Sequence, residues 1–260
     1  VSAFDVAWDV WHLYYADSST GQVAVGDKSL VYAGAPAWRA GELAAPKLLV
    51  NRGYLVGYSE TQRGPLWAGY RVDDLATVPN PPPRPEQFEV DRRTISRVPP
   101  DAYTGSGFDR GHLAPNYAIA TRYGPAAQAE TFLMSNITPQ RHTLNAGLWR
   151  ELERKIATNY PARYGEVWIF VGPVFGERPR LLRGGVAVPE AFFLIVIDEH
   201  EGRLRTLALL VPQDAPADAN PSRYLTTIAE IQRRTHLDFL HELDDRAEHL
   251  IEVQRAARLW

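Results

Sequence analysis

The feature that most constrains the fold is a pair of strand-length segments separated by a short polar turn. Residues 191–197 form the longest uninterrupted apolar run of the chain, and residues 203–211 follow after Glu199-His-Glu-Gly202. The run is far too short to cross a bilayer, which takes about 20 apolar residues. Its length and its enrichment in β-branched and aromatic side chains indicate a buried strand. The two segments together predict an antiparallel hairpin over residues 191–198 and 203–211.

Further segments predict both strands and helices. Strands are expected at 54–58, 66–72 and 166–175, with a short apolar strand from residue 131 that ends at Ser135-Asn136. Helices are expected at 145–158, 220–234 and 245–259. In the first helix Leu148, Leu152 and Ile156 recur every four residues and form an apolar stripe. In the second, Asn220-Pro221 supplies a capping side chain and a proline at the first helical position. We therefore expect an α+β fold with a mixed, mainly antiparallel central sheet and flanking helices.

The chain divides into an N-terminal extension and one main domain. Residues 51–260 are expected to form the domain with its C-terminal helix, and residues 1–50 to pack on it as an extension. The extension contains an aromatic stretch, Trp8, Trp11, Tyr14 and Tyr15, to which the sequence assigns no chemistry. The proline-rich segment 80–85 can hold neither a ladder nor a helix. We interpret it as a surface loop within the domain, because the motifs on its two sides belong together.

Composition excludes several classes of chemistry. The chain has 260 residues, 45% of them hydrophobic and 23% charged, as in an ordinary globular protein with a substantial core. It has no cysteine, which excludes disulfides, Fe–S clusters, thiolate zinc sites and thiol nucleophiles. A chain without thiols suits an oxidising compartment, so we expect a secreted or periplasmic protein rather than a cytoplasmic one.

Net charge neither favours nor opposes binding to nucleic acid. The formal net charge is −3. Residues 237–260 carry six acids against three arginines, so the rest of the chain is neutral. The basic residues are almost all arginine, which binds phosphate well through its forked guanidinium.

The segment Asp109-Arg110-Gly111-His112 contains side chains suited to phosphodiester hydrolysis. That reaction needs a base to deprotonate water, a cation for the charge growing on phosphate, and help for the leaving oxygen. His112 can act as the base and Arg110 can bind phosphate oxygens. Gly111 is expected to allow a tight turn between them, while Asp109 either orients a neighbour or is structural. A single His in such a segment is equally compatible with an ordinary surface or core position.

A second group of polar residues follows at regular spacing. Asn136 closes the short strand, Asn145 lies nine residues further on, and Glu153 eight beyond that. On an α-helix eight residues correspond to a rise of ~12 Å and two turns plus about 80°, which puts Asn145 and Glu153 on neighbouring flanks. A metal ion held by Asn145 would then reach Glu153 only through coordinated water, an arrangement that suits Mg²⁺. A plain helix N-cap at Asn145 and a solvated or paired charge at Glu153 explain the spacing as well.

The chain from residue 106 to residue 149 resembles the DNA/RNA non-specific endonucleases of the ββα-metal type. The matching pieces are Asp109-Arg-Gly-His-Leu-Ala-Pro115, Ser135-Asn-Ile-Thr-Pro-Gln140 and Leu144-Asn-Ala-Gly-Leu-Trp149, followed by Glu153. Their order and spacing are those of the family. A weaker resemblance extends back to Arg63-Gly-Pro-Leu-Trp67 and forward through residues 166–211.

This resemblance implies a role for each matching residue. His112 is the general base on water, Arg110 binds the substrate phosphate, and Asn136 holds the segment of His112 in place. Asn145 is the one direct protein ligand of a hydrated Mg²⁺ ion, for which Mn²⁺ or another divalent cation can substitute, and Glu153 binds the waters of that ion. Arg63 matches the arginine that stabilises transition-state charge. Where some members have a further helix arginine this chain has Ala157, so that either Arg154 or no residue takes its place.

The expected function is therefore Mg²⁺-dependent, sequence-independent endonuclease activity on DNA and RNA, with no membrane partner. Two other functions remain compatible with the sequence: a phosphodiesterase of the same fold with a narrower substrate, and an inactive module that only binds nucleic acid. The sequence also leaves open whether an inhibitor protein or a second copy of the chain binds. The other six histidines show no metal-ligand spacing, although His142 lies close to the expected site.

Overall fold

The computed structural model describes residues 24–25, 28–39, 44–200 and 202–260. The aromatic stretch around Trp8 and Trp11 lies outside these residues. A seven-stranded sheet, in which every neighbouring pair is antiparallel, forms the centre of the molecule. In spatial order its strands are β12 (Leu225–Thr226), β11 (Arg203–Pro212), β10 (Ala191–His200), β9 (Glu166–Val174), β6 (Gly64–Asp73), β5 (Leu55–Ser59) and β4 (Lys47–Val50). The mainly antiparallel α+β fold expected from the sequence is confirmed.

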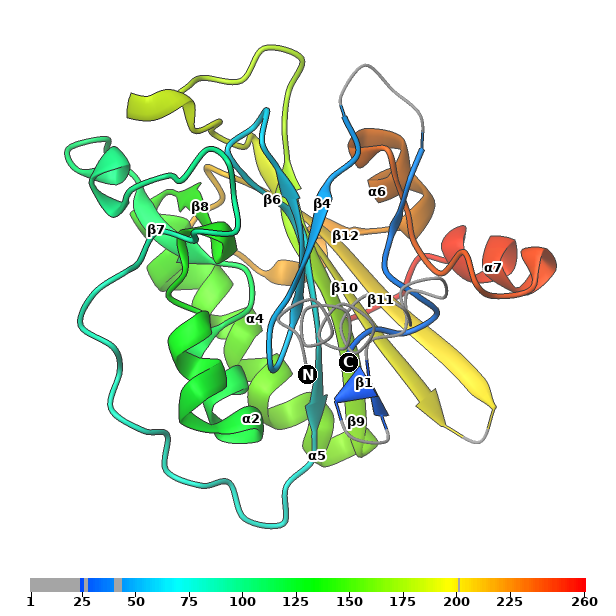
Figure 1. Cartoon of the computed structure of the whole chain (residues 1–260). Coiled ribbons are helices and arrows are strands. Elements are labelled where there is room, and N and C mark those ends of the chain that lie inside the picture. The colour runs from blue at the N-terminus through cyan, green and yellow to red at the C-terminus, as the bar shows by residue number, and fades with distance from the viewer. Residues whose placement is uncertain (1–23, 26–27, 40–43, 201) are drawn as a thin grey trace, which may run out of the picture.

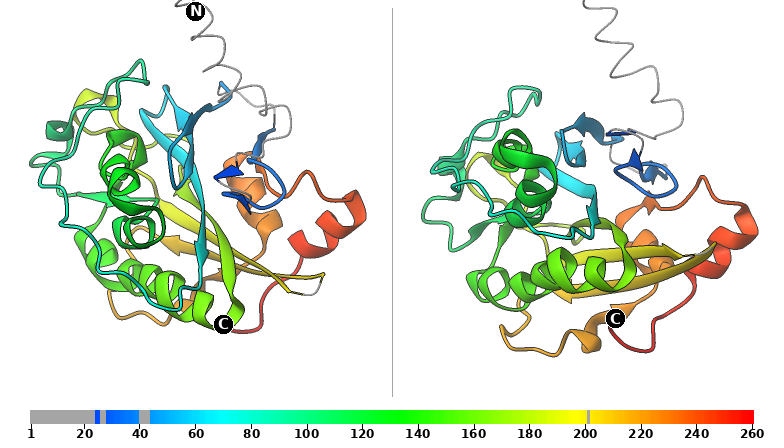
Figure 2. Two further views of the ribbon diagram at one scale, coloured as in Figure 1. Left: turned by 60° about the horizontal axis from the view of Figure 1, so that its bottom comes forward. Right: turned by 90° about the horizontal axis from the view of Figure 1, so that it is seen from below.

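Both faces of this sheet are buried, which explains the continuous apolar run in β10. Phe192, Leu194 and Val196 belong to one core cluster, and the alternate residues Phe193, Ile195 and Ile197 belong to another. A strand covered on both faces has no solvent side and needs apolar residues at every position. Figures 1 and 2 show the green helices on one side of the sheet and α6 (Ile228–Thr235) and α7 (Asp245–Glu252) on the other side.

The first face is covered by α2 (Asn116–Glu130) and by a long irregular helical segment. This segment consists of α3 (His142–Leu144), a π turn (Asn145–Trp149), α4 (Arg150–Arg154), a second π turn (Lys155–Asn159) and α5 (Tyr160–Tyr164). It starts before the expected 145–158 and ends after it, at Gly165, whose φ of 85° stops the helix. The expected stripe of Leu148, Leu152 and Ile156 is buried in the first core cluster. No helix in the described part of the chain is long and apolar enough to cross a membrane.

The second face is covered by α6 and by residues that precede the main sheet. Leu30 and Val31 are buried beside Phe170 and Ile231 in the second core cluster. Short strand pairs accompany them: β1 (Ala24–Val25) with β2 (Lys28–Ser29), and β3 (Ala37–Trp38) with β13 (Leu237–Asp238). Strand β4 pairs with β5, so the central sheet begins before the boundary expected at residue 51.

The structure corrects three expected boundaries near chain turns. Instead of a strand of that length, residues 131–132 form a turn after α2, Leu133 makes one isolated parallel bridge to Glu89, and a 3₁₀ turn η3 (Met134–Asn136) leads into strand β8 (Ile137–Gln140). The backbone bonds from Thr131 to Gln128 and from Asn136 to Leu133 are local, while the Phe132 carbonyl and the Met134 N–H bind Glu89. Two more short 3₁₀ turns, η2 (Pro100–Tyr103) and η6 (Arg183–Gly185), lie in loops between the strands.

The helix expected at 220–234 is divided. Pro221–Tyr224 form a 3₁₀ turn, Leu225–Thr226 pair with β11 at the edge of the sheet, and α6 starts only after Thr227. The Thr227 side chain accepts a hydrogen bond from the backbone N–H of Glu230 at 3.1 Å, which is a helix cap of the Thr-x-x-Glu type. Leu225 and Thr226, which the sequence pattern assigned to the helix, therefore belong to the edge strand of the sheet.

The last helix ends at Glu252 rather than near residue 259. Beyond it the chain turns back to the sheet, and the Trp260 ring packs at 5.2 Å from Tyr164 and 5.9 Å from Tyr160. A straight helix through residue 259 would leave this aromatic ring without that contact, and burial of an aromatic side chain outweighs a few residues of exposed helix.

The tight packing of the sheet predicts a sharp difference between two glycines. A Cβ at Gly172 would lie 2.3 Å from the Leu66 carbonyl oxygen and 2.6 Å from the Phe193 ring, whereas a Cβ at Gly64 would have its nearest neighbour at 3.9 Å. We expect Gly172→Ala to lower the free energy of unfolding by about 1–3 kcal/mol and Gly64→Ala to leave it nearly unchanged, measured by urea denaturation. Equal midpoints for the two variants would contradict this account of the packing.

Candidate active site

The site is built on two short strands and the start of the long helical segment. Strand β7 (Asp109–His112) pairs antiparallel with β8, with Asp109 opposite Gln140 and His112 opposite Ile137. The helix follows β8 after a single residue, Arg141. This is the ββα arrangement implied by the family resemblance. It places the residues from Asp109 to His112 beside the first turns of the helix.

Gly111 serves a purpose different from the expected tight turn. It lies within the extended strand β7, and a Cβ there would lie 2.3 Å from the side-chain oxygen of Gln140 and 2.8 Å from its Cβ. Glycine is therefore needed for close approach of the strands, because any side chain would push β7 away from β8.

The helix is irregular at the point where it carries the expected metal ligands. Residues Asn145–Trp149 form a π turn, with Gly147 at φ −107° and ψ −113°. The non-helical Gly147 interrupts the helix between Asn145 and Glu153, so the angle of about 80° expected for an ideal helix does not apply. A Cβ at Gly147 would lie only 2.5 Å from the Cβ of Ala217, so glycine permits this turn to pack against the loop after β11. Asn145 and Glu153 both line the cavity described below.

Five of the six residues expected at the site lie around or beside one cavity of about 800 Å³, which we call the active-site cavity. Four of them line it directly: Arg110, His112, Asn145 and Glu153. Other lining residues are Arg84, Asn116, Arg150 and Arg154. Asn136 lies behind the cavity, fully buried.

His112 packs against two phenylalanine rings that also contact each other. Its imidazole lies 5.1 Å from the ring of Phe132 and 5.5 Å from the ring of Phe88. The backbone keeps these rings together, because Glu89 donates to the Phe132 carbonyl at 3.0 Å and Met134 donates to the Glu89 carbonyl at 2.8 Å. Burial, together with the positive charge of Arg84, lowers the pKa of His112 to about 3. The imidazole is therefore neutral near pH 7 and has a lone pair available for a proton.

Arg84 is a residue of the site that the sequence reasoning missed. Its guanidinium carbon lies 5.2 Å from the centre of the Phe132 ring, and its charge acts on both His112 and Glu153. It belongs to the proline-rich segment, which runs in a wide arc outside α2 (Figure 1) and is held to that helix by a bond from Gln128 to the Pro82 carbonyl. The only signal in the sequence was an arginine between two prolines, a position with a restricted backbone but no catalytic pattern.

Arg63 is the expected residue that the structure does not bring to the cavity. It lies in the turn between β5 and β6, where its backbone has φ 51° and its guanidinium donates to the Gly184 carbonyl. The Arg63 side chain lies next to Gly184 and Gly185, and it does not line the active-site cavity.

Arg110 presents a guanidinium that is already oriented. Its Nε and Nη2 donate to the Pro100 carbonyl at 3.0 and 2.7 Å, and its guanidinium carbon lies 5.6 Å from the centre of the Phe88 ring. These contacts fix the plane of the group before any substrate arrives. The N–H groups not bound to Pro100 are then available to a phosphate oxygen.

Asp109 orients the residue expected to bind metal. Its Oδ2 accepts hydrogen bonds from Asn145 Nδ2 and from His142 Nδ1, both at 2.9 Å. Because the Asn145 nitrogen is used in this way, its amide oxygen is the atom left for a cation. His142 itself is 79% exposed and acts here only through Asp109.

The cavity offers the oxygen donors that a hard divalent cation requires. Burial raises the pKa of Glu153 to about 8, against the opposing charge of Arg84. A buried carboxyl shifts in this way when no cation neutralises it, and a bound divalent ion would restore its ionised form. The buried Oδ1 of Asn116 has no hydrogen-bond partner among the described residues. The donor set of Asn145, Glu153 and Asn116 therefore fits Mg²⁺ with water completing its shell.

Arg154, the alternative to the missing helix arginine, lines the cavity but is already engaged. Its Nε and Nη2 donate to Glu151 at 2.9 and 2.7 Å. Ala157 also lines the cavity, so no side-chain charge stands at that position.

Asn136 joins the segment after His112 to the turn before β8. Its Oδ1 accepts from the backbone N–H of Ala114 at 2.9 Å, and its Nδ2 donates to the Ala114 carbonyl at 2.9 Å and to the Thr131 carbonyl at 3.0 Å. Its own carbonyl accepts from Leu113. One side chain thus acts as a short strand partner for the backbone that follows the histidine.

Comparisons with known proteins agree with this geometry. The sequence model of the DNA/RNA non-specific endonuclease family matches residues 41–246. The chain is 32% identical to mitochondrial endonuclease G of Homo sapiens over 238 residues, covering 82% of this chain and 75% of the relative. It is 28% identical to a nuclease of Nostoc sp. over 217 residues, covering 79% of this chain and 77% of the relative.

A solved structure shares the fold. The crystal structure of the EndoG/EndoGI complex contains a chain that matches with a TM-score of 0.70 at 20% identity, over 82% of this chain and 90% of that one. The resemblance stated from the sequence motifs is confirmed. The chain belongs to the DNA/RNA non-specific endonuclease family and is a hydrolytic endonuclease.

The bonds of Asn136 predict a large effect of its removal. Asn136→Ala leaves the Ala114 N–H and the Ala114 and Thr131 carbonyls without their partner in a fully buried position, and each unsatisfied group costs about 1–3 kcal/mol. We expect the free energy of unfolding to fall by at least ~2 kcal/mol in urea denaturation, whereas Asn159→Ala at an exposed position should change it little. A stability of Asn136→Ala equal to that of the parent would show that these bonds contribute nothing net.

Proposed function

We propose that the chain is a Mg²⁺-dependent endonuclease that hydrolyses phosphodiester bonds in DNA and RNA with little sequence preference, and that His112 is its general base. The observation that carries this proposal is the composition of one cavity. A neutral imidazole, the two expected metal ligands Asn145 and Glu153, and the guanidinium groups of Arg84 and Arg110 all line it.

The neutral state of His112 supports its role as a base. Its ring contacts Phe88 and Phe132, and burial together with the charge of Arg84 lowers its pKa and so keeps the imidazole unprotonated. A neutral imidazole can accept a proton from water. His112 takes a proton from the attacking water, and the hydroxide attacks phosphorus. A bound Mg²⁺ ion would supply positive charge to the phosphate and to the leaving oxygen.

The remaining residues bind and orient. Asn145, held by Asp109, would ligate the ion directly through its amide oxygen, and Glu153 would hold its coordinated waters. Arg110 binds a phosphate oxygen with the N–H groups that Pro100 leaves free. We assign to Arg84, rather than to Arg63, the stabilisation of charge in the transition state, because Arg84 lines the cavity and Arg63 does not.

The lining also supports the lack of sequence preference. Arg84, Arg110, Arg150 and Arg154 are suited to phosphates, and contacts to phosphates carry no sequence information. Binding that rests on phosphates weakens steeply with salt. We also propose that the protein is secreted or periplasmic, because a chain without cysteine suits an oxidising compartment.

The first prediction concerns the metal. Digestion of plasmid DNA and of RNA should stop in excess EDTA and return with Mg²⁺ or Mn²⁺. Full activity in the presence of excess chelator contradicts the metal assignment.

The next prediction concerns the general base. His112→Ala should lower the rate of digestion by about 10²–10⁴-fold with an unchanged circular dichroism spectrum. If His112→Ala cuts at near the parental rate, another residue is the base.

A further prediction separates the two arginines. Arg84→Ala should lower the rate by about 10²–10³-fold, because a preorganised positive charge is lost where negative charge develops. Arg63→Ala is the matched control, since it removes the same group from a position outside the cavity. The measurement is initial rate on plasmid DNA at saturating Mg²⁺. A larger loss of rate in Arg63→Ala than in Arg84→Ala would instead assign the stabilisation of transition-state charge to Arg63.

A further inference from the structure

Helix α7 is docked on the molecule in an unusual way. Among its residues only Glu252 is fully buried, at 7% exposure, whereas Leu250 and the following Val253 are 52% and 48% exposed. Ile251 is partly buried against the second core cluster. A surface helix is normally held by an apolar stripe. Here a carboxylate occupies the most buried position of the contact.

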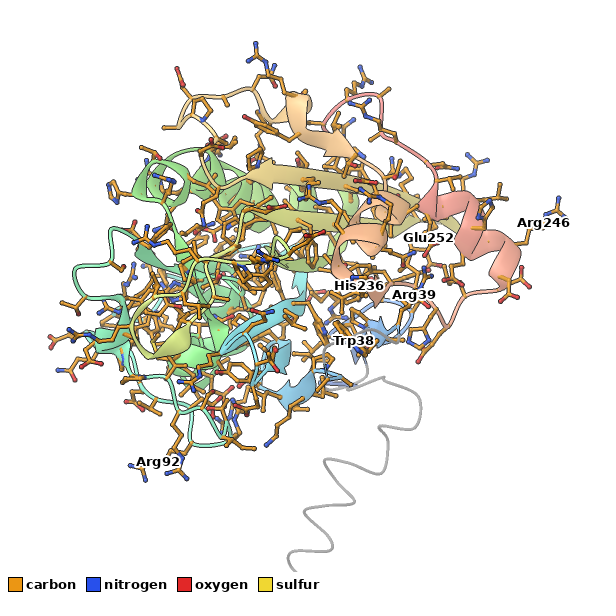
Figure 3. The ribbon with its side chains drawn as sticks, turned by 90° about the horizontal axis from the view of Figure 1, so that it is seen from above. Trp38, Arg39, Arg92, His236, Arg246 and Glu252 are labelled. Carbon is orange, nitrogen blue, oxygen red and sulfur yellow. The ribbon has the colours of Figure 1, made fainter. Side chains whose placement is uncertain are left out.

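Two further carboxylates surround Glu252. Asp238 comes from strand β13, and Glu248 lies one turn earlier on α7. One carboxylate oxygen of each of the three residues lies within 4.8 Å of the others. Figure 3 shows Glu252 where α7 meets the body of the molecule, near Arg39, while Arg246 points outward from the far side of the helix.

The charge of this cluster is only partly balanced. Arg39 Nη2 binds Asp238 Oδ1 at 2.6 Å, and its side chain is 52% exposed. The amide of Gln232 also favours ionised Glu252, but the Oε1 atom of Glu252 is buried without a hydrogen-bond partner among the described residues. Burial, then Glu248 and Asp238, raise the pKa of Glu252 to about 7. A buried carboxylate oxygen without a partner is costly unless a cation or donor meets it.

We propose that Asp238, Glu248 and Glu252 form a second divalent-cation site, selective for Ca²⁺, that fastens helix α7 to strand β13. It is independent of the site at Asn145 and of the nuclease reaction, and lies with α7 on the opposite side of the central sheet (Figure 1).

The ligand set favours Ca²⁺ over Mg²⁺. Ca²⁺ binds oxygens at 2.3–2.6 Å, so two of its ligands can lie up to about 4.6–5.2 Å apart, and three oxygens within 4.8 Å of one another can share one ion. Mg²⁺ binds at 2.0–2.1 Å and gives up its waters reluctantly, which makes a three-carboxylate cage unsuitable for it. Two of the ligands are i,i+4 neighbours on α7 and the third lies on β13, so a bound ion would tie the helix to the strand pair β3–β13.

The test uses thermal denaturation of the full chain in chelator and in millimolar Ca²⁺. Ca²⁺ should raise the midpoint of the parent by about 5–10 °C at a concentration 100-fold above its Kd. Glu252→Gln and Asp238→Asn should abolish that rise. In chelator, Glu252→Gln should melt at or above the parental midpoint, because it removes a buried charge that nothing balances. A purely structural role of Glu252 predicts the reverse in chelator.

The nuclease metal site is removed from the measurement by working in Asn145→Ala. Calorimetric titration of that variant with Ca²⁺ should show one site, which is lost when Glu252→Gln is added and kept when Asp245→Asn is added. Asp245→Asn is the charge-matched control, since Asp245 lies on the same helix but outside the cluster. Absence of Ca²⁺ binding in Asn145→Ala, unchanged binding after both Glu252→Gln and Asp238→Asn, or tighter binding of Mg²⁺ than of Ca²⁺ would overturn the proposal.

Discussion

The position of His112 depends on one buried amide. Asn136 offers the backbone of Ala114 both a donor and an acceptor, as a neighbouring strand would, and it binds Thr131 as well. In the described part of the chain strand β7 pairs only with β8, and Asn136 supplies the bonds to the backbone that follows His112, at Leu113 and Ala114. This junction fixes the segment that carries His112. The rings of Phe88 and Phe132 and the helix that carries Asn145 and Glu153 lie around that segment.

Electrostatics in the cavity follow from burial and from the charge of Arg84. Burial raises the pKa of Glu153 and lowers that of His112, while Arg84 opposes the first shift and adds to the second. Opposite shifts in an acid and a base arise from one cause, because burial disfavours whichever form is charged. A divalent cation in such surroundings keeps more of its field than it would in water.

Most of the main elements could be predicted from sequence, but α2 and β4 were not predicted, nor were the ends of several elements. The run in β10 and the stripe on the long helix are signals set by burial, and the hairpin partner of β10 was predicted correctly. The kink at Gly147 within the π turn is invisible to periodicity, so the angle that an ideal helix gives between Asn145 and Glu153 does not hold. Edge pairing of Leu225–Thr226 and the return of Trp260 to Tyr164 depend on tertiary contacts that no local pattern records.

The same division holds for the site. Residues inside the continuous motifs, from Asp109 to His112 and from Asn145 to Glu153, were located because these motifs resemble those of the family, whereas their spacing alone left a helix cap and a solvated charge as alternatives. Arg84 was missed because a loop of prolines brings it across from a remote part of the chain, and Arg63 was chosen because a short motif resembled the expected one. The roles of Asp109 and Gly111 became visible only with the neighbours Asn145 and Gln140 in place.

The loop that carries Arg84 has a consequence for how this enzyme can change over evolutionary time. The arc between β6 and η2 brings Arg84 to the cavity lining and Phe88 against His112, yet neither residue belongs to the two clusters that bury the faces of the central sheet. Under the role proposed for Arg84, substitutions at this residue would alter turnover while the central sheet keeps its packing. Part of the catalytic rate thus depends on a loop outside the main core, so that selection can adjust it without disturbing that core.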